Sequence, residues 1–113
     1  MNITSEQKPW GSFTTLTKNE PSTVKLLYVT KGEEISLQYH NHREEFWKII
    51  SGNPLITIGD STVTANPDDE FFISQGTNHQ ISAPEDNCVI LEISIGDFDE
   101  NDITRLSDKY GRN

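Results

Sequence analysis

Cysteine is almost absent from this chain of 113 residues, since Cys88 is the single one. An intrachain disulfide needs two cysteines, so none can form. Small secreted domains commonly depend on disulfides, and a chain without them fits a reducing compartment. We therefore expect a cytoplasmic protein in which Cys88, at the start of an apolar run, is a buried and unreactive thiol.

Long apolar runs and basic residues are also scarce. No stretch approaches the roughly 18 to 20 apolar residues that a membrane-spanning helix requires, and the polar opening MNITSE lacks signal-peptide character. Nine Lys and Arg stand against 18 Asp and Glu, which gives a formal net charge of −9. Because nucleic-acid binding depends on basic side chains that neutralise phosphates, we expect neither nucleic acid nor membrane as a partner. An anionic substrate would need a local cluster of basic side chains.

Short β-type segments separated by turn residues make up most of the chain. With 33% hydrophobic residues, the sequence can form one thin core, so residues 1–113 are expected to fold as a single domain. Such strands are typical of an all-β jelly-roll barrel. Runs rich in β-branched and aromatic residues predict strands over residues 23–30, 35–41, 45–51, 54–58, 61–65, 71–74, 79–82 and 88–95.

One short helix is predicted near the C-terminus, from residue 100 to about residue 107. Ile103 and Leu106 lie three positions apart, which is a helical spacing. Acidic residues precede this segment and basic residues follow it, an order that complements the helix dipole. We therefore expect the all-β domain to end in a C-terminal helix.

The three histidines carry the main functional signal. His40 and His42 are two positions apart in a predicted strand, so their imidazoles are expected on the same face, together with Gln38. A lone His-x-His pair is more often an exposed feature of a strand surface. Here Glu45 begins the next predicted strand and His79 begins a later one. Their presence favours a metal site over the surface interpretation.

Taken together, these positions resemble the two signature motifs of the cupins. The first reads Gly32, His40-x-His42, Glu45 and Gly52, and the second reads Gly76-x-x-His79. The resemblance implies a cupin double-stranded β-helix, the jelly-roll barrel of that superfamily. It also implies one divalent metal ion, for which we favour Zn²⁺, although Mn, Fe, Co or Ni would suit the same donors. The implied metal ligands are His40, His42, Glu45 and His79.

A longer set of segments resembles one family in particular. Residues 8–13, 24–25, 35–47 with Gly52, 92–96 and 102–112 are similar to the type II mannose-6-phosphate isomerase domain. In many bacteria that domain is the C-terminal cupin of a bifunctional isomerase and mannose-1-phosphate guanylyltransferase. The guanylyltransferase half has no counterpart in this sequence, so the resemblance implies a stand-alone cupin domain over residues 1–113.

The resemblance implies that mannose 6-phosphate and fructose 6-phosphate are interconverted through an enediolate. This chemistry needs a group that holds the phosphate, a charge that stabilises the enediolate oxygens and a base that moves a proton. Arg binds phosphate through two parallel hydrogen bonds. The small phosphorylated sugar would be bound by Gln38, Arg43, Lys25, Arg105 and Arg112. The base stays open among Glu45, His79 and Lys25.

The sequence departs from the family pattern at Phe46, Ser74 and Ala83, at Lys8, where Arg is common, and in the acidic loop 96–102, which is about one residue short. Strand alternation places Phe46 opposite to Glu45, where it would concern packing or a dimer face. Two other functions therefore stay open. One is a metal-dependent cupin dioxygenase, because the same ligands suit iron, and the other is a sugar-phosphate-binding cupin without catalysis. A homodimer is compatible with so thin a core.

Overall fold

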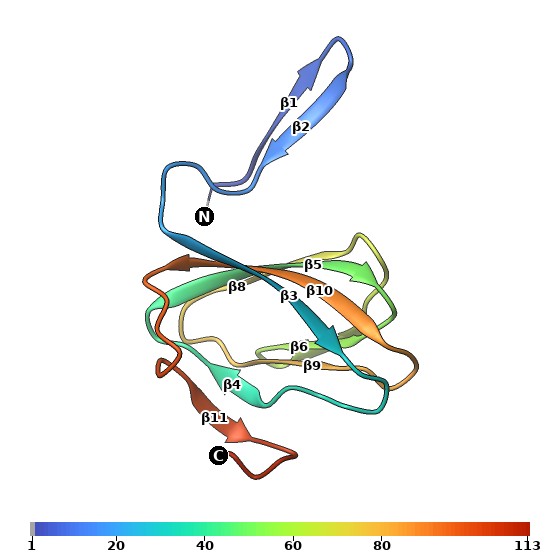
Figure 1. Ribbon diagram of the computed structural model, residues 1–113, viewed down its shortest axis with the longest axis vertical. Helices are drawn as coiled ribbons and strands as arrows, with labels where there is room; N and C mark the ends of the chain where they lie inside the picture. Colours follow the sequence, from blue (N-terminus) through green and yellow to red (C-terminus); the bar gives the residue numbers. More distant parts are fainter. Residues whose placement is uncertain (1) are drawn as a thin grey trace.

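The chain folds into two β-sheets that face each other, with a separate hairpin at the N-terminus (Figure 1). The computed structural model describes residues 2–113, and this part of the chain contains strands and no helix. One sheet has four strands in the order β3-β10-β5-β8, and the other has five in the order β11-β4-β9-β6-β7. Neighbouring strands are antiparallel. This arrangement confirms the predicted all-β jelly-roll barrel.

The eight strands predicted from the sequence are all present, as β3 to β10. The N-terminal hairpin and the last strand were not among them. The strand bounds are β1 Thr4–Lys8, β2 Gly11–Thr15, β3 Ser22–Val29, β4 Leu37–Tyr39, β5 Arg43–Ser51, β6 Leu55–Ile58, β7 Ser61–Thr64, β8 Glu70–Ile73, β9 His79–Ser82, β10 Cys88–Gly96 and β11 Thr104–Ser107.

The predicted C-terminal helix is wrong, because its second half is strand β11. Thr104 pairs with Tyr39 of β4, and Arg105 pairs with Gln38. The three-residue spacing of Ile103 and Leu106 would favour a helix if both side chains packed on one buried face. Leu106 is 51% exposed, so the two do not form such a face. The backbone N–H and C=O groups of this segment form hydrogen bonds with β4 instead of helical hydrogen bonds. Among residues 2–113 there is thus no helix long and apolar enough to cross a membrane.

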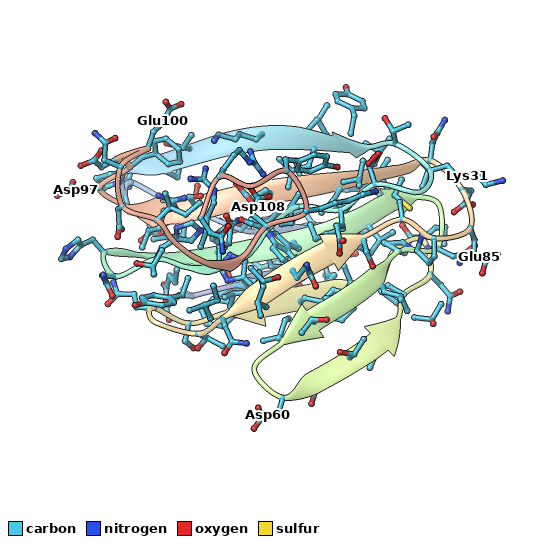
Figure 2. The ribbon with its side chains drawn as sticks, turned by 90° about the horizontal axis from the view of Figure 1, so that it is seen from below. Lys31, Asp60, Glu85, Asp97, Glu100 and Asp108 are labelled. Atoms are coloured by element: carbon cyan, nitrogen blue, oxygen red, sulfur yellow. The ribbon has the colours of Figure 1, made fainter. Side chains whose placement is uncertain are left out.

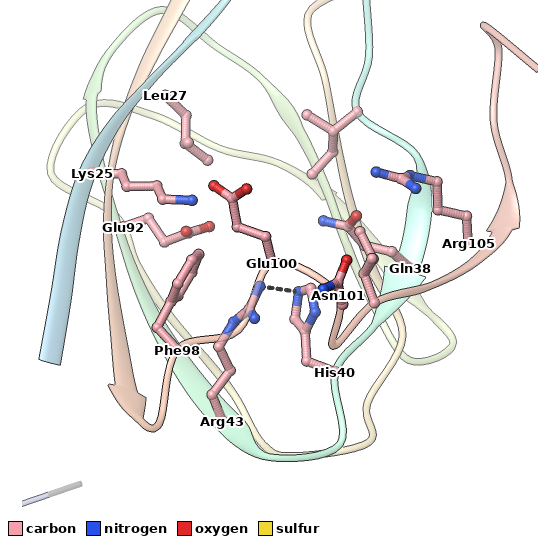
Figure 3. Close-up of a pocket in the computed structure, with 12 residues that line it drawn as sticks. Lys25, Leu27, Gln38, His40, Arg43, Glu92, Phe98, Glu100, Asn101 and Arg105 are labelled. Carbon is pink, nitrogen blue, oxygen red and sulfur yellow. Dashed lines mark hydrogen bonds between the residues drawn. The ribbon is translucent and has the colours of Figure 1, made fainter. Parts of the chain in front are cut away.

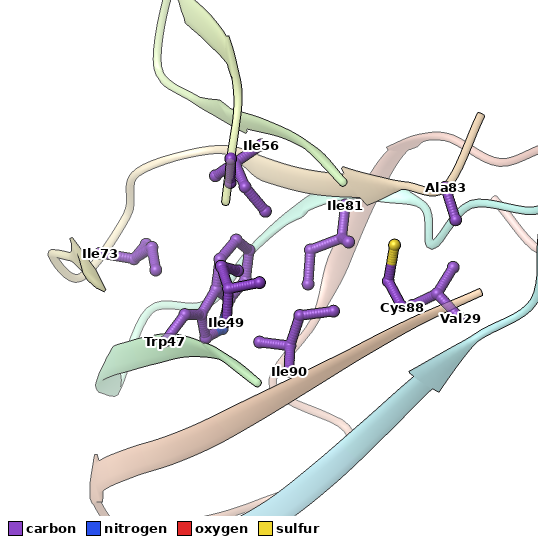
Figure 4. Close-up of a cluster of buried hydrophobic side chains, with 10 residues drawn as sticks. Val29, Trp47, Ile49, Ile56, Ile73, Ile81, Ala83, Cys88 and Ile90 are labelled. Carbon is purple, nitrogen blue, oxygen red and sulfur yellow. The ribbon is translucent and has the colours of Figure 1, made fainter. Parts of the chain in front are cut away.

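Large aliphatic side chains fill one half of the space between the sheets (Figure 4). Trp47 and Ile49 of β5 meet Ile81 of β9 and Ile90 of β10, and all four are fully buried. Cys88 is buried in the same cluster, as expected, and burial raises the pKa of its thiol. The core is thin and leaves the other half of the barrel for polar side chains.

Charged side chains gather in the loops at the ends of the barrel (Figure 2). Asp97 and Glu100 lie at one end, Lys31 and Glu85 lie at the other, and Asp60 lies at the tip of the turn between β6 and β7. Loops are solvated and expose their backbone, so charged residues are well tolerated there. Of these residues, Glu100 borders the cavity that is described below.

Gly52, which ends β5, is a position where only glycine fits. Its φ is +83°, and a Cβ built there would lie 2.6 Å from the Asn87 carbonyl oxygen and 2.7 Å from the Cys88 sulfur. We expect Gly52→Ala to destabilise the protein by about 1–3 kcal/mol, because it combines backbone strain with overpacking. The free energy of unfolding in urea measures this change. The control is Gly59→Ala, where φ is +59° but nothing lies within 4 Å of the built Cβ. An equal loss in both variants would contradict the role of close packing.

Candidate metal centre

Three buried side chains from both sheets converge inside the barrel. His40 directly follows β4, His79 begins β9, and Glu45 comes from β5 on the facing sheet. The Nε2 atom of His40 lies 2.9 Å from Glu45 Oε1, and the Nε2 atom of His79 lies 3.3 Å from the same oxygen. One donor atom from each residue lies within 4.8 Å of the other two. The facing sheets therefore build a compact His₂Glu cluster.

Backbone carbonyl groups determine which imidazole nitrogens face Glu45. The Nδ1 atom of His40 lies 2.7 Å from the Asp102 carbonyl oxygen, and Nδ1 of His79 lies 2.9 Å from that of Thr77. A carbonyl oxygen only accepts hydrogen bonds, so each Nδ1 carries the proton and donates it. In the neutral imidazoles, the lone pairs on Nε2 then point toward the Glu45 carboxylate.

This arrangement requires positive charge at its centre. Burial alone would raise the pKa of Glu45, but the His40 and His79 imidazoles beside the carboxylate outweigh burial and hold the pKa far below its usual range. Glu45 is therefore ionised. Among the described residues, Glu45 Oε1 and His79 Nε2 are buried without a hydrogen-bond partner. A proton or a metal ion must lie among these atoms, and a divalent cation fits two imidazole nitrogens and a carboxylate oxygen.

His42 does not join this cluster, contrary to the prediction from its spacing. Strand β4 ends at Tyr39, and the chain bends at residues 41–42. The backbone N–H groups of Asn41 and His42 both donate to the Asp102 carboxylate, at 2.9 Å each. The alternation of side chains holds only within a strand, so the bend turns His42 outward and leaves it exposed.

Gln38 shares the inner face with His40, as the sequence analysis predicted. It lies in β4 two residues before His40, and its Cα pairs with that of His79 across β9. Gln38 and His40 line the same cavity (Figure 3), while Ser36 Oγ donates a 3.0 Å hydrogen bond to Gln38 Oε1. An amide oxygen is a suitable ligand for divalent cations. The same-face pair is therefore Gln38 and His40, not His40 and His42.

The cavity beside the cluster has a volume of about 520 Å³ and gathers basic side chains on an acidic protein. Lys25, Arg43 and Arg105 line it, as their predicted role in substrate binding requires (Figure 3). Arg112 does not line it. The Arg112 guanidinium pairs with Asp108 at 2.8 and 3.0 Å on the surface, so its position in the sequence motif does not bring it to the site.

Arg43 is buried next to the candidate metal ligands. Its Nη2 lies 3.3 Å from His40 Nε2, and its Nη1 donates to the Asp99 carbonyl oxygen at 3.1 Å. The Phe98 ring lies between Arg43 and Lys25, at 4.5 Å from the guanidinium carbon and 4.3 Å from the ammonium nitrogen. Cation–π contact keeps both cations at the cavity without neutralising them. Nε atoms of Arg43 and Arg105 are buried without a hydrogen-bond partner among the described residues.

Glu92 is a site residue that the sequence analysis missed. It is buried in β10 and lines the cavity, and its Oε2 accepts a 3.2 Å hydrogen bond from Trp47 Nε1. The same Nε1 lies 3.4 Å from Glu45 Oε2. Burial and the neighbouring Glu45 raise the pKa of Glu92 to about 8. A signal was present, because Glu92 is the single charged residue in the run CVILEISI and shares its inward face with Ile90.

The substitutions Phe46, Ser74 and Ala83 lie away from the cavity, whereas the short acidic loop 96–102 contributes Phe98, Glu100 and Asn101 to its lining. Phe46 is buried on the outer face of the four-stranded sheet, Ser74 is exposed, and Ala83 lies in the aliphatic core. None of the three lines the cavity among the described residues. These three substitutions therefore do not change the residues that line the cavity.

A jelly-roll barrel with a buried His/Glu cluster defines a cupin. Among solved structures, a cupin protein from Bacteroides fragilis superimposes with a TM-score of 0.61 at 26% sequence identity, over 66% of this chain and 65% of that one. The family model described as mannose-6-phosphate isomerase C-terminal matches residues 2–108. The chain therefore belongs to this family, and the resemblance found in its sequence is confirmed.

The relatives are much longer than this chain. Mannose-1-phosphate guanylyltransferase of Salmonella montevideo is 36% identical over 108 residues, which cover 94% of this chain and 23% of that protein. Mannose-1-phosphate guanylyltransferase 2 of Escherichia coli O157:H7 is 33% identical over 105 residues, which cover 91% and 22%. The chain thus spans less than a quarter of the length of these relatives.

Asp102 connects the C-terminal segment to the candidate metal centre, and the contribution of its carboxylate to stability can be tested. Hydrogen bonds from the Asn41 and His42 backbone hold the pKa of Asp102 below its ordinary value of 3.8. A carboxyl with a lowered pKa stabilises the folded state above its ordinary pKa, and this contribution is lost as pH falls through the lowered value.

We expect Asp102→Asn to reduce the free energy of unfolding by up to about 1 kcal/mol near neutral pH, a small loss because the group is partly solvated. The gap between wild type and variant should close when the pH falls below 3.8. Urea titrations at neutral and acid pH measure both effects. Asp60→Asn, at the exposed turn between β6 and β7, is the control and should change neither value. A gap that widens in acid would contradict this explanation.

Proposed function

We propose that this domain is a metal-dependent aldose–ketose isomerase that interconverts mannose 6-phosphate and fructose 6-phosphate. Membership of the mannose-6-phosphate isomerase C-terminal family supports the substrate class. The observation that carries the proposal is the buried Glu45 oxygen, which faces two imidazole nitrogens beside a cavity lined by cations.

The metal ion would be held by His40, Glu45 and His79, with the Gln38 amide oxygen as a fourth ligand. These donors suit Zn²⁺, which we favour, and also Mn, Fe, Co or Ni. A divalent ion bound there would supply positive charge beside the oxygens on C1 and C2 of the substrate. His42 has no part in this ligand set, because it is exposed beyond the end of β4.

Phosphate binding is assigned to Lys25, Arg43 and Arg105. The three cations border one cavity on a chain of net charge −9 and outnumber Glu92 and Glu100 in its lining, so they supply the local positive charge that an anionic substrate requires. The buried Nε atoms of Arg43 and Arg105 have no partner among the described residues. They are N–H donors that a phosphate or hydroxyl oxygen would satisfy.

Glu92 is the base that this site supports best. The earlier candidates have other roles: Glu45 and His79 would bind the metal, and Lys25 would bind phosphate. The raised pKa of Glu92, about 8, lies close to neutral pH, where a general base is most efficient. Ionised Glu92 takes the proton from C2 of the open-chain aldose and leaves an enediolate. The hydroxyl proton on O2 then passes to O1, the protonated Glu92 carboxyl returns its proton to C1, and C2 becomes the carbonyl carbon of the ketose.

The ligand set is tested by comparing His40→Ala with His42→Ala. We expect His40→Ala to lose bound metal, because it removes one of the donors around Glu45, whereas His42→Ala should retain it. Gln38→Leu should weaken metal binding at least about tenfold, since it removes an oxygen ligand without changing charge. Mass spectrometry measures the metal content, and isothermal titration calorimetry measures the affinity for the metal. Retention of full metal by His40→Ala, or loss by His42→Ala, would overturn the proposed set.

The catalytic role of Glu92 is tested by Glu92→Gln. We expect kcat for mannose 6-phosphate to fall by about 10²- to 10⁴-fold, as is typical for loss of a general base, with metal content unchanged. Proton exchange at C1 and C2, followed by NMR in heavy water, should fall in parallel. Glu85→Gln at the opposite end of the barrel is the control and should match wild type.

Two results would argue against these assignments. Full exchange in Glu92→Gln would exclude Glu92 as the base. Metal-loaded wild type that binds mannose 6-phosphate without any proton exchange would exclude the isomerase and favour a binding domain.

A further inference from the structure

The last part of the chain crosses from one sheet to the other beside the candidate metal centre. β10 ends at Gly96 in the four-stranded sheet, and β11 lies at the edge of the five-stranded sheet, next to β4 (Figure 1). We call residues 103–112 the C-terminal strap. Two of its side chains, Ile103 and Arg105, line the cavity. The strap therefore forms part of the cavity wall and contributes one of the cations assigned to phosphate binding.

Asp102 fixes the start of the C-terminal strap to the barrel. Its carboxylate accepts hydrogen bonds from the backbone N–H groups of Asn41 and His42. Its carbonyl oxygen lies 2.7 Å from Nδ1 of His40. A movement of the strap would pivot at this anchor and leave the proposed metal ligands in place.

Little apolar packing holds the C-terminal strap beyond this anchor. Among the described residues, none from the strap belongs to either buried apolar cluster. Leu106 is 51% exposed and Tyr110 is 50% exposed. β11 pairs with β4 alone, and the register is irregular between Arg105 and Ser107. A segment with few buried apolar contacts and one short pairing opens locally at a low cost in free energy.

The far end of the C-terminal strap is held by polar contacts to Glu33, in the loop between β3 and β4. Glu33 Oε2 accepts a 2.9 Å hydrogen bond from Lys109 Nζ and a 2.8 Å hydrogen bond from the Tyr110 hydroxyl. Lys109 Nζ also donates to the Gly32 carbonyl oxygen at 2.8 Å. We call these contacts the latch. The Lys109 and Glu33 side chains are both partly solvated. Because solvated ion pairs contribute little free energy, the latch can open and close.

A tight turn at the end of the strap positions the two latch donors. The Asp108 carboxylate accepts hydrogen bonds from the backbone N–H of Arg112 at 2.6 Å and from its guanidinium at 2.8 and 3.0 Å. The Gly111 N–H donates to the Asp108 carbonyl oxygen at 3.1 Å. The turn places Lys109 and Tyr110 against the loop between β3 and β4. Arg112 thus shapes the turn instead of lining the cavity.

The cations around the cavity couple the C-terminal strap to an anion. Lys25 and Arg43 belong to the four-stranded sheet, whereas Arg105 belongs to the strap. These like charges repel each other, and Glu92 and Glu100 in the same lining offset part of the repulsion. A phosphate between them would replace repulsion by attraction on both sides. A ligand that contacts both parts favours the conformation in which they are close together.

We propose that the C-terminal strap is a clamp that closes on the phosphate of the substrate, and that Glu33 is the positioning residue that holds it closed. The proposal rests on the proposed function for the identity of the phosphorylated ligand. Closure brings Arg105 to an anion that Lys25 and Arg43 bind from the other side. Glu33 is absent from the described residues that line the cavity, so it acts through the latch and not on the substrate.

The latch is tested without substrate by hydrogen–deuterium exchange in Glu33→Ala. The backbone amides of the strap should exchange at least about fivefold faster than in wild type, because the variant raises the population of the open strap. The amides of β5 and β10 should not change. The control is Glu70→Ala, which removes another solvated ion pair, with Lys48, on the four-stranded sheet. Unchanged exchange in the strap of Glu33→Ala would overturn the latch.

The coupling to an anion is tested with inorganic phosphate and with mannose 6-phosphate. Either ligand should slow exchange in the wild-type strap, and Arg105→Met should lose this protection. By calorimetry, Glu33→Ala should bind both ligands about three- to tenfold more weakly, whereas Glu70→Ala should match wild type. In turnover of mannose 6-phosphate, Glu33→Ala should raise KM and leave kcat and metal content unchanged.

A double-mutant cycle separates the latch from a general loss of stability. Lys109→Met should weaken binding by a factor similar to that of Glu33→Ala, and the double variant should be little weaker than either single variant, since both changes remove the same contact. Fully additive effects would contradict a shared latch.

Two further results would overturn the clamp. One is unchanged exchange in the wild-type strap at high concentrations of both ligands, and the other is full affinity in Glu33→Ala. Protection of the strap by mannose 6-phosphate without proton exchange at C1 and C2 has a different meaning. It would exclude the isomerase activity and support the clamp.

Discussion

The structure depends on one buried oxygen atom, Oε1 of Glu45, and on the two imidazole nitrogens that face it. An ionised carboxylate inside a protein is costly unless positive charge and hydrogen bonds compensate for it. Here the compensating groups come from β4 and β9 in one sheet, while Glu45 comes from β5 in the other. The distance between the sheets is thus linked to the chemistry of the site. The Asp102 carbonyl oxygen, which orients His40, links the C-terminal segment to the same atom.

Trp47 divides the barrel into an apolar half and a polar half. Its ring belongs to the aliphatic core, while its Nε1 lies within 3.4 Å of Glu45 and 3.2 Å of Glu92. One donor therefore contacts two buried carboxyl groups whose pKa values are shifted in opposite directions. When two neighbouring acids differ in this way, one stays ionised and the other exchanges a proton near neutral pH. This difference supports separate roles for Glu45 as a ligand and Glu92 as a base.

Much of the fold and part of the site could be predicted from the sequence. The strands β3 to β10, the family and the grouping of His40, Glu45 and His79 followed from strand periodicity and from motif resemblance. The place of His42 could not be predicted, because it depends on where β4 ends, and the Asp102 carboxylate that holds the bend lies about 60 residues away along the chain. The same long-range pairing with β4 makes residues 104–107 a strand, although their local spacing is helical. Strand alternation places Glu92 on the inner face of β10 together with Ile90, so its role could have been predicted. It was overlooked because its neighbours in the sequence are apolar.

Adjacent residues on the central strands serve two separate surfaces. Glu45 faces the site while its neighbour Phe46 faces outward, and on β10 the same holds for Glu92 and Ile93. A substitution at an outward position can therefore change the outer surface and leave the inner donors in place. This explains why Phe46 can depart from the family pattern while the cluster around Glu45 is complete. The period of two in a β-strand lets the buried donors and the outer surface of this small domain vary independently, and Phe46 packs with Ile93 and Leu16 on that outer surface.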